Sequence, residues 1–589
     1  MSPHRQTTAL EHPPGCFDES RPTAVPAGRL TAPRHGAAEA GRTKPAGGAL
    51  PVFPGAGSVV SACSLALALF CLILLPARRA PAATSTWDGT GGNVNWSTGG
   101  NWGGSAPTSS TATDLIFAGT NNVGTSGTPL NQNIASPMLL NSLTFNSGGG
   151  PFFLGGSALR FQAASNTITQ NSSSAVSIAN DINAPSSNSS FAISLTGDGR
   201  GIVTLGGVIA SGSGQRDYAL VKSGSSTFAL GGANTYGGDT TINGGVLLLT
   251  NVNALPNRLI MNGGVLGLGA ADYTRVLGTG ANQVSFAGSG GFAAYGADRN
   301  VNLGGAGGTI TWGSGSFVAT GSAFILGASS ADKTVTFQNS IAFGAVTRTV
   351  QVDDGAATVD GVLSGVLSGT GGLTKTGYGA LTLSNANTFS GITTINAGIL
   401  SATVNSALGS TTKVTVNTGG TLLLGGAGTN KIGDTTEIDL AGGTVNTGGL
   451  TEVVGKLTLS SHSTLDFGSG ASIFTFDGAS SLGVGTLVVL NWTGVIGSIG
   501  GTDRLLFDNS SFVAGTTTNQ ILFDIGGIYY TADFKTVDGN TVEAVAGLAI
   551  VPEPSTIFAV SLLGMLIGWR ERHRLSGLLS GMVLREVHA

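Results

Sequence analysis

The residues best suited to acid–base chemistry in this sequence are three aspartates that lie close together. Asp353, Asp354 and Asp360 fall in the stretch VDDGAATVDG and form the densest group of carboxylates in the chain. Clustered carboxylates are what a polysaccharide lyase or hydrolase needs for general acid–base catalysis. These three lie between glycines, with no histidine and no Arg-x-Lys pattern nearby. We therefore interpret the stretch as a solvated turn.

Other reactive side chains are scarce. His462 is the only histidine between residues 84 and 550, and we interpret it as an isolated, exposed side chain. All three cysteines, Cys16, Cys63 and Cys71, precede residue 84. A catalytic triad or a zinc site therefore lacks ligands, and no calcium-binding nonapeptide is present. The sequence predicts a protein that is not an enzyme and holds no metal or other cofactor.

The composition favours many short strands. The 589 residues include 96 glycines but only 10% charged and 6% aromatic residues, and Val, Ile, Leu and Ala alternate with Thr, Ser and Asn. Residues 84–550 hold 15 Lys and Arg against 24 Asp and Glu, a net charge of −9. Phosphate recognition needs clustered cations, so nucleic-acid binding is disfavoured. The fold class predicted is all-β.

Two segments repeat without a gap at an offset of 153 residues. Residues 220–255 and 373–408 are identical at 17 of 36 positions, including Lys222/Lys375 and the Ala-Asn-Thr at 233–235 and 386–388. Internal repetition of this kind is the signature of a solenoid or array. Within each copy, apolar alternation breaks at Asn and Gly, which suit the corners of a coil because they tolerate left-handed backbone.

These copies resemble the autotransporter-associated β-strand repeat, also called the passenger-associated transport repeat. The resemblance implies a right-handed parallel β-helix with terminal caps, which composition alone does not distinguish from stacked sandwiches. We expect an N-terminal cap and first coils over residues 84–160, the β-solenoid over 161–500, and a C-terminal cap over 501–550.

Three of the six tryptophans lie close together near the start of this region, at Trp87, Trp96 and Trp102. They could cap the open end of a solenoid, whose first coil must be covered, or they could stack on sugar rings as part of a glycan-binding module. We favour the cap.

The N-terminal region has the composition of an export signal. Residues 1–57 show no apolar periodicity and are expected to be disordered. Residues 58–83 contain the apolar run SVVSACSLALALFCLILL and then small residues, which predicts a secretory signal cleaved near Ala82 or Ala83. The alternative is a transmembrane helix, because the run is near the minimum length for a bilayer.

Residues 551–574 combine a short motif, an apolar run and a basic cluster. Val551, Pro552, Glu553 and Pro554 precede the apolar residues 557–569, and Arg570, Arg572 and Arg574 follow them. The segment resembles a PEP-CTERM sorting signal of Gram-negative bacteria, which implies processing by an exosortase. This apolar run is short for a permanent anchor, so we expect transient membrane insertion; the alternative is a buried C-terminal helix. The tail at 575–589 departs from the family pattern.

Together these features predict an exported structural or adhesin-like protein of the cell surface, outer membrane or extracellular matrix. Its expected partners are secretion machinery and an exosortase-type sorting enzyme, with extracellular polysaccharide as a candidate ligand. The alternatives are a carbohydrate-active enzyme, either a polysaccharide lyase or a hydrolase, and a glycan-binding module on the same scaffold.

Overall fold

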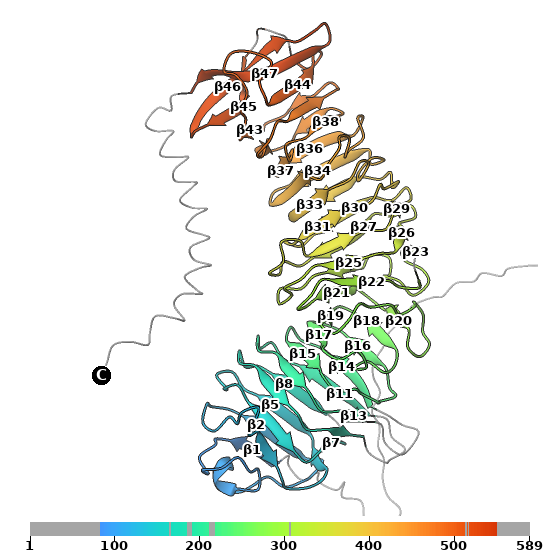
Figure 1. Ribbon diagram of the computed structural model, residues 1–589, viewed down its shortest axis with the longest axis vertical. Coiled ribbons are helices and arrows are strands. Elements are labelled where there is room, and N and C mark those ends of the chain that lie inside the picture. The colour runs from blue at the N-terminus through green and yellow to red at the C-terminus, as the bar shows by residue number, and fades with distance from the viewer. Residues whose placement is uncertain are drawn as a thin grey trace, which may run out of the picture. The chain divides into compact units, whose positions relative to one another are not determined.

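The computed structural model describes residues 83–163, 166–184, 191–210, 218–305, 308–512, 515 and 517–550. These residues form β-strands joined by turns, with one short 3-10 helix at Gly99–Trp102. The chain winds in coils, and up to β45 the paired strands run parallel, each beside the equivalent strand of a neighbouring coil (Figure 1). The predicted all-β parallel β-helix is confirmed.

The longest sheet, called the long sheet below, runs through most of the described coils. In order its sixteen strands are β3 (Leu130–Gln132), β6 (Phe153–Gly156), β9 (Val176–Ile178), β12 (Val203–Leu205), β15 (Thr227–Leu230), β17 (Val246–Leu249), β19 (Val265–Leu268), β21 (Gly290–Ala294), β24 (Ala323–Leu326), β27 (Arg348–Val352), β30 (Leu373–Thr376), β32 (Thr393–Ile395), β34 (Lys413–Asn417), β36 (Glu437–Ala441), β39 (Leu457–Leu459) and β42 (Ser481–Leu482).

Two further sheets lie on different faces of the coils, because strands of the N-terminal sheet come before strands of the long sheet along the chain and strands of the C-terminal sheet come after them. The N-terminal sheet contains β1 (Ala83–Trp87), β2 (Thr113–Phe117), β5 (Ser142–Phe145), β8 (Thr167–Gln170), β11 (Phe191–Thr196), β14 (Tyr218–Lys222), β16 (Thr240–Ile242), β18 (Leu259–Met261) and β20 (Val284–Phe286). The C-terminal sheet contains β22 (Arg299–Val301), β25 (Val335–Phe337), β28 (Gly361–Leu363), β31 (Ala380–Leu383), β33 (Gly398–Ala402), β35 (Gly420–Leu424), β37 (Thr444–Asn446), β40 (Ser463–Asp466), β43 (Leu487–Leu490), β45 (Thr517–Ile525), β46 (Ile528–Thr536), β47 (Thr541–Ala549), β44 (Arg504–Asp508), β41 (Ile473–Phe476) and β38 (Thr451–Val454).

Some coils carry a third strand, and these strands form two small sheets. One contains β13 (Ile209–Ala210), β10 (Ile182–Asn183), β7 (Leu159–Phe161) and β4 (Met138–Leu140), and the other β23 (Thr309–Thr311), β26 (Ser340–Ala342) and β29 (Leu367–Ser368).

Alternating side chains fill the inside of the coils. In the N-terminal sheet Leu143, Ile168 and Leu195 lie in register on successive strands and are fully buried. Their neighbours along the strands, such as Thr144, face outward. Because the side-chain period of a strand is two residues, in-register pairing stacks like on like and gives one continuous apolar core.

The coils become shorter at the repeats. Leu195 pairs with Lys222, and Lys222 pairs in turn with Ile242, so the second of these coils takes fewer residues than the first. The second copy shows the same short coil, because Lys375 pairs with Ile395. A short coil has two strands, so at the repeats the third face of the coil contains no strand.

An asparagine takes the place of that missing strand. In the first copy Asn234 Oδ1 accepts the N–H of Ile209 in β13 at 2.8 Å, and its Nδ2 donates to the carbonyl of Ala254 at 2.7 Å. In the second copy Asn387 makes the same two bonds, from the N–H of Leu367 in β29 at 2.8 Å and to the carbonyl of Ala407 at 2.8 Å. The side-chain amide thus continues the ladder as a peptide group would.

The first coil is covered by an aromatic cluster. Trp87 and Trp96 are fully buried and Trp102 is 6% exposed, and all three pack around Phe117. The indole N–H of Trp102 donates to the carbonyl of Trp96 at 2.8 Å, and that of Trp87 donates to the carbonyl of Asn122 at 3.1 Å. The sugar-stacking alternative for these tryptophans is wrong, because their rings face the core.

The last described strands turn antiparallel. β45 continues β43 in parallel, but β46 and β47 run antiparallel and join β45 to β44. This arrangement pairs edges that a parallel stack would otherwise leave open to other chains.

Several predictions from the sequence concern residues outside this description. They are the disordered segment 1–57, nearly all of the signal at 58–83, the sorting signal at 551–574 and the tail at 575–589. Within the described ranges, no helix is long and apolar enough to cross a bilayer.

The asparagine contacts predict a specific loss of stability. Changing Asn387 to Ala leaves the N–H of Leu367 and the carbonyl of Ala407 buried without this partner, which costs about 2–4 kcal/mol. We expect faster amide exchange in the coils on both sides, measured by hydrogen–deuterium exchange. Asn385→Ala is the matched control, because half-buried Asn385 makes one bond, to the carbonyl of Ser364. Equal effects of the two changes would contradict the role given to Asn387.

Candidate functional site

The three aspartates of the sequence do not form a catalytic pair. Asp360 is only 2% exposed, and its carboxylate accepts the N–H groups of Gly355 at 2.8 Å and of Ala380 at 2.9 Å. The interpretation of a solvated turn is therefore wrong for this residue. Ala380 lies on the next coil, so the carboxylate of Asp360 links two coils by a hydrogen bond.

The other two aspartates differ from it. Asp354 is exposed, as expected of a turn. Asp353 is half-buried and accepts a hydrogen bond from the side-chain amide of Gln351 at 2.8 Å. Burial raises the pKa of the Asp353 carboxyl above its usual range. Of the three, only Asp353 lines a cavity.

His462 is exposed, as predicted, and its Nδ1 accepts the N–H of Thr486 at 3.2 Å. No group of three or more His, Cys, Asp or Glu side chains placed to hold a metal ion occurs in the described part of the chain.

The predicted processing residues are mostly beyond the described ranges. Ala82 and the sorting residues Val551, Pro552, Glu553, Pro554, Arg570, Arg572 and Arg574 all lie outside them. Ala83 is the first residue of β1, and its N–H donates to the carbonyl of Ala112 at 2.9 Å.

The repeated lysines have a role that the sequence did not reveal. Lys222 and Lys375 are fully buried, although no carboxylate among the described residues contacts them. Each ammonium donates to three backbone carbonyls at a corner of its coil. For Lys222 these belong to Ser223, Gly224 and Gly244 at 2.8–3.1 Å, and for Lys375 to Thr376, Gly377 and Ala397 at 2.7–3.1 Å.

The third carbonyl in each set belongs to the following coil, so the lysine ties two coils together. Next to it, Gly245 has a φ of +62°, and a Cβ there would lie 2.7 Å from Lys222 Nζ. Burial lowers the pKa of each lysine to about 8. The charge of Asp198 opposes this shift for Lys222, and that of Asp360 opposes it for Lys375. The only sequence signal for this device is the identical Lys-x-Gly in both copies.

A groove crosses the outer face of the long sheet. Its floor follows one column of side chains that pair in register across six strands, from β15 to β27. The column is Thr227, Val246, Val265, Gly291, Ile325 and Gln351. Residues elsewhere on this face are mainly polar, but here Val246, Val265 and Ile325 belong to a second apolar cluster, separate from the core.

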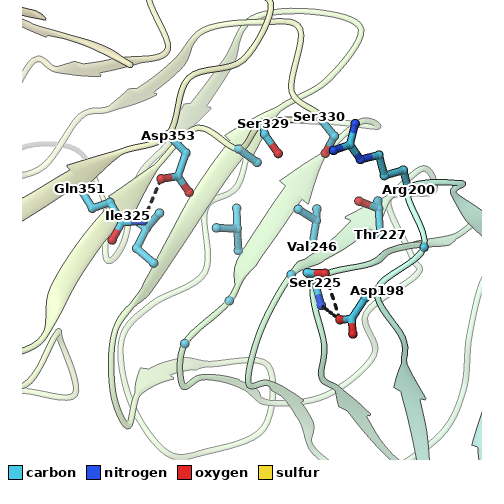
Figure 2. A pocket seen from close by; sticks show the side chains of 16 residues that line it. Asp198, Arg200, Ser225, Thr227, Val246, Ile325, Ser329, Ser330, Gln351 and Asp353 are labelled. Carbon is cyan, nitrogen blue, oxygen red and sulfur yellow. Dashed lines mark hydrogen bonds between the residues drawn. The ribbon is translucent and has the colours of Figure 1, made fainter. Parts of the chain in front are cut away.

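The groove has polar ends, as Figure 2 shows. Asp198, Arg200 and Ser225 lie at one end, and Gln351 and Asp353 lie at the other. Its volume is about 680 Å³, and the exposed hydroxyls of Ser329 and Ser330 also line it. The Asp198 carboxylate accepts the N–H and the hydroxyl of Ser225 through Oδ1, at 3.1 and 3.0 Å. Among the described residues, no aromatic side chain is part of the lining.

Beyond the groove, the same face of the long sheet carries polar side chains, which are charged on β34 and β36 at Lys413, Glu437 and Asp439 and include one column of threonines. Thr349, Thr374, Thr394 and Thr415 lie in register on four successive strands, β27, β30, β32 and β34. Neighbouring strands are about 4.8 Å apart, so the threonines form a regular column.

Comparison with known proteins supports the resemblance of the two copies. Residues 220–249 and 373–402 match the family model of the passenger-associated-transport-repeat. The chain is also 29% identical over 297 residues to an "Adhesin BmaC autotransporter" of Brucella suis biovar 1 (strain 1330). That alignment covers 43% of this chain but only 8% of the adhesin. No solved structure matches the chain.

The buried lysines predict how stability depends on pH. Their pKa is about 8 in the fold and 10.5 ordinarily, so above pH 8 the unfolded chain binds more protons and stability rises. Above pH 10 it falls, because burial raises the pKa of Tyr218, Tyr236 and Tyr295 to about 12. We expect the urea midpoint of unfolding to be highest near pH 10. The free energy of unfolding there should exceed that at pH 8 by a few kcal/mol. A double Lys222→Met and Lys375→Met variant should lose the rise and keep the fall.

Proposed function

We propose that this protein is an exported, non-enzymatic structural or adhesin-like component of the cell surface or extracellular matrix. The observation that carries the proposal is the in-register column of threonines on the outer face of the long sheet. This column repeats the same side chain on four successive strands, so several weak contacts with a repetitive partner act together. Linked contacts give an overall affinity far above that of any single one.

The comparisons add support of a different kind. The matched repeat model is named for passengers and their transport, and the relative over 297 residues is named an adhesin and an autotransporter. Because the chain covers a small share of that relative, the adhesive role of this protein is our proposal and not a transferred activity.

An enzymatic role on the same scaffold has less support. Catalysis of glycosidic cleavage uses two carboxyl groups that flank the bond. Asp360 accepts the N–H of Gly355 in its own turn through one carboxylate oxygen and the N–H of Ala380 on the next coil through the other, so it is not available to act with Asp353.

The processing that we propose fits the bounds of the first and last described strands. Cleavage near Ala82 or Ala83 would leave the paired residues of β1 almost intact, since this strand begins at Ala83. Cleavage by an exosortase-type enzyme near Pro552–Pro554 would leave β47 intact, since that strand ends at Ala549. Export through the secretion machinery and transient membrane insertion of the segment after Pro554 would come before this cleavage. Release or display of the protein would follow it.

This route is tested by the termini of the protein recovered from culture medium and from the cell envelope. We expect a product that starts near residue 83 and ends near residue 553, measured by intact mass and terminal sequencing. Replacing Pro552, Glu553 and Pro554 by Ala should leave the C-terminal segment attached and hold the protein in the membrane fraction.

The matched control replaces Ser555 and Thr556 by Ala, just outside the motif, and should be processed normally. Full-length chain recovered from the cytoplasm in the unaltered strain would remove the proposed location and the function that depends on it.

A further inference from the structure

We propose that the groove on the long sheet binds a linear, uncharged polysaccharide that lies along the stack of coils. This inference rests on the extracellular role proposed above and names a ligand class and a site for it. The groove is bounded by Asp198 at one end and Asp353 at the other, with the column from Thr227 to Gln351 as its floor.

The length of the groove favours a polymer. Its floor crosses six strands, and five steps of about 4.8 Å span about 24 Å. A small ligand is bound by a pocket that encloses most of its surface. This groove instead runs along the coil axis, so a ligand that fills it must extend across several coils.

The chemistry of the floor disfavours a peptide. Each floor strand from β15 to β24 is paired on both sides, so no backbone N–H or carbonyl is free to extend the sheet. The middle of the floor is lined by Val246, Val265 and Ile325, which offer no hydrogen-bonding side chain, and Gly291 of the same column has no side chain. An extended peptide would bury amide groups there without partners, at a cost of about 1–3 kcal/mol each.

A sugar chain does not meet this problem. Val246, Val265 and Ile325 are only 4–6% exposed, so the C–H faces of the sugar rings touch these side chains over a small area, and most of the contact comes from the polar groups that line the groove. The sugar hydroxyls lie at the ring edges, so they can reach the sides and ends of the groove. Since the described lining contains no aromatic side chain, binding depends on these aliphatic and polar contacts together.

Polar groups without protein partners mark the two ends. Within the described residues, Asp198 uses only Oδ1 and Asp353 uses only Oδ1, which leaves one carboxylate oxygen free at each end. The hydroxyl of Thr227 also has no hydrogen bond there, although this residue is only 6% exposed. Hydrogen bonds from sugar hydroxyls to carboxylates are charge-assisted and therefore among the stronger ones.

The charge of the lining selects against acidic polymers. Two carboxylates, Asp198 and Asp353, face a single cation, Arg200, which has no ion-pair partner in the described part of the chain. A chain of uronic acids would meet net repulsion in the groove. An uncharged chain meets none, and its hydroxyls can use both the acceptors and the guanidinium.

The test is native affinity electrophoresis of the full chain in gels that contain hydroxyethylcellulose, dextran, mannan or polygalacturonate. We expect at least one of the three neutral polymers to retard the protein, and polygalacturonate not to. Asp198→Ala and Asp353→Asn should each weaken that binding about tenfold, because each removes a charged acceptor. Ser329→Trp, at an exposed position of the lining, should obstruct the groove and abolish it.

The matched control is Asp181→Asn. Asp181 is exposed and accepts the N–H of Val208 on the next coil, as Asp198 accepts that of Ser225, but it lies outside the groove. Its variant should bind as the unaltered protein does, and circular dichroism checks that all variants are folded. Retardation by no neutral polymer, stronger retardation by polygalacturonate, or equal binding by folded groove variants would overturn the inference.

These outcomes are separate from those of the export experiment. A protein that is correctly processed but fails to bind leaves the proposed function standing and ends the inference about the groove. A protein that binds through the groove but is found full-length in the cytoplasm leaves the inference about the groove standing and ends the proposed function.

Discussion

The structure depends on one constraint, which is that every coil must satisfy the backbone hydrogen bonds of the coil before it. A parallel stack has no turn at which this demand is met locally, so each N–H and carbonyl on one coil needs a partner on the next. In-register pairing meets the demand along the faces and at the same time aligns the apolar side chains of the core. The same constraint explains the antiparallel strands β44–β47, which pair edges at the end of the stack.

Corners and short coils are where strands cannot supply these partners. There the chain uses side chains in their place, and the two copies use the same ones. Asn234 and Asn387 continue the third face by one step, and Lys222 and Lys375 hold three carbonyls at another corner. Each side chain donates to a carbonyl of the following coil, so residues that the two copies share are those that join coils.

The outer faces are free of this constraint, and they differ from place to place. Over much of the long sheet they carry threonines and other polar residues. Between β15 and β24 they become apolar and glycine-rich, and Gly291 allows a close approach, since a Cβ there would lie 1.6 Å from the carbonyl oxygen of Ile325. The fold thus offers a repetitive polar surface together with one groove that has a definite direction and polar ends. These are the two surfaces through which we propose that the protein acts outside the cell.

The sequence by itself determined that the fold is all-β and where its repeats lie, because strand alternation and glycine corners are local properties that both copies share. The β-helix was implied by the resemblance of the copies to a known repeat, since composition alone does not distinguish it from stacked sandwiches. The sequence also indicated that the tryptophans near Trp87 form a cap. It could not show that Asp360 is buried, because its partner Ala380 is distant in the chain and becomes a neighbour only when the coils stack. The groove was invisible for the same reason: Val246, Val265 and Ile325 form a column only through the register of their strands, and the spacing of these residues in the chain is irregular. The two copies even occupy different faces, since β14 of the first belongs to the N-terminal sheet and β30 of the second to the long sheet. Local chemistry determined where each coil has its strands and corners. The stacking of coils of unequal length decided which side chains of different coils come into contact.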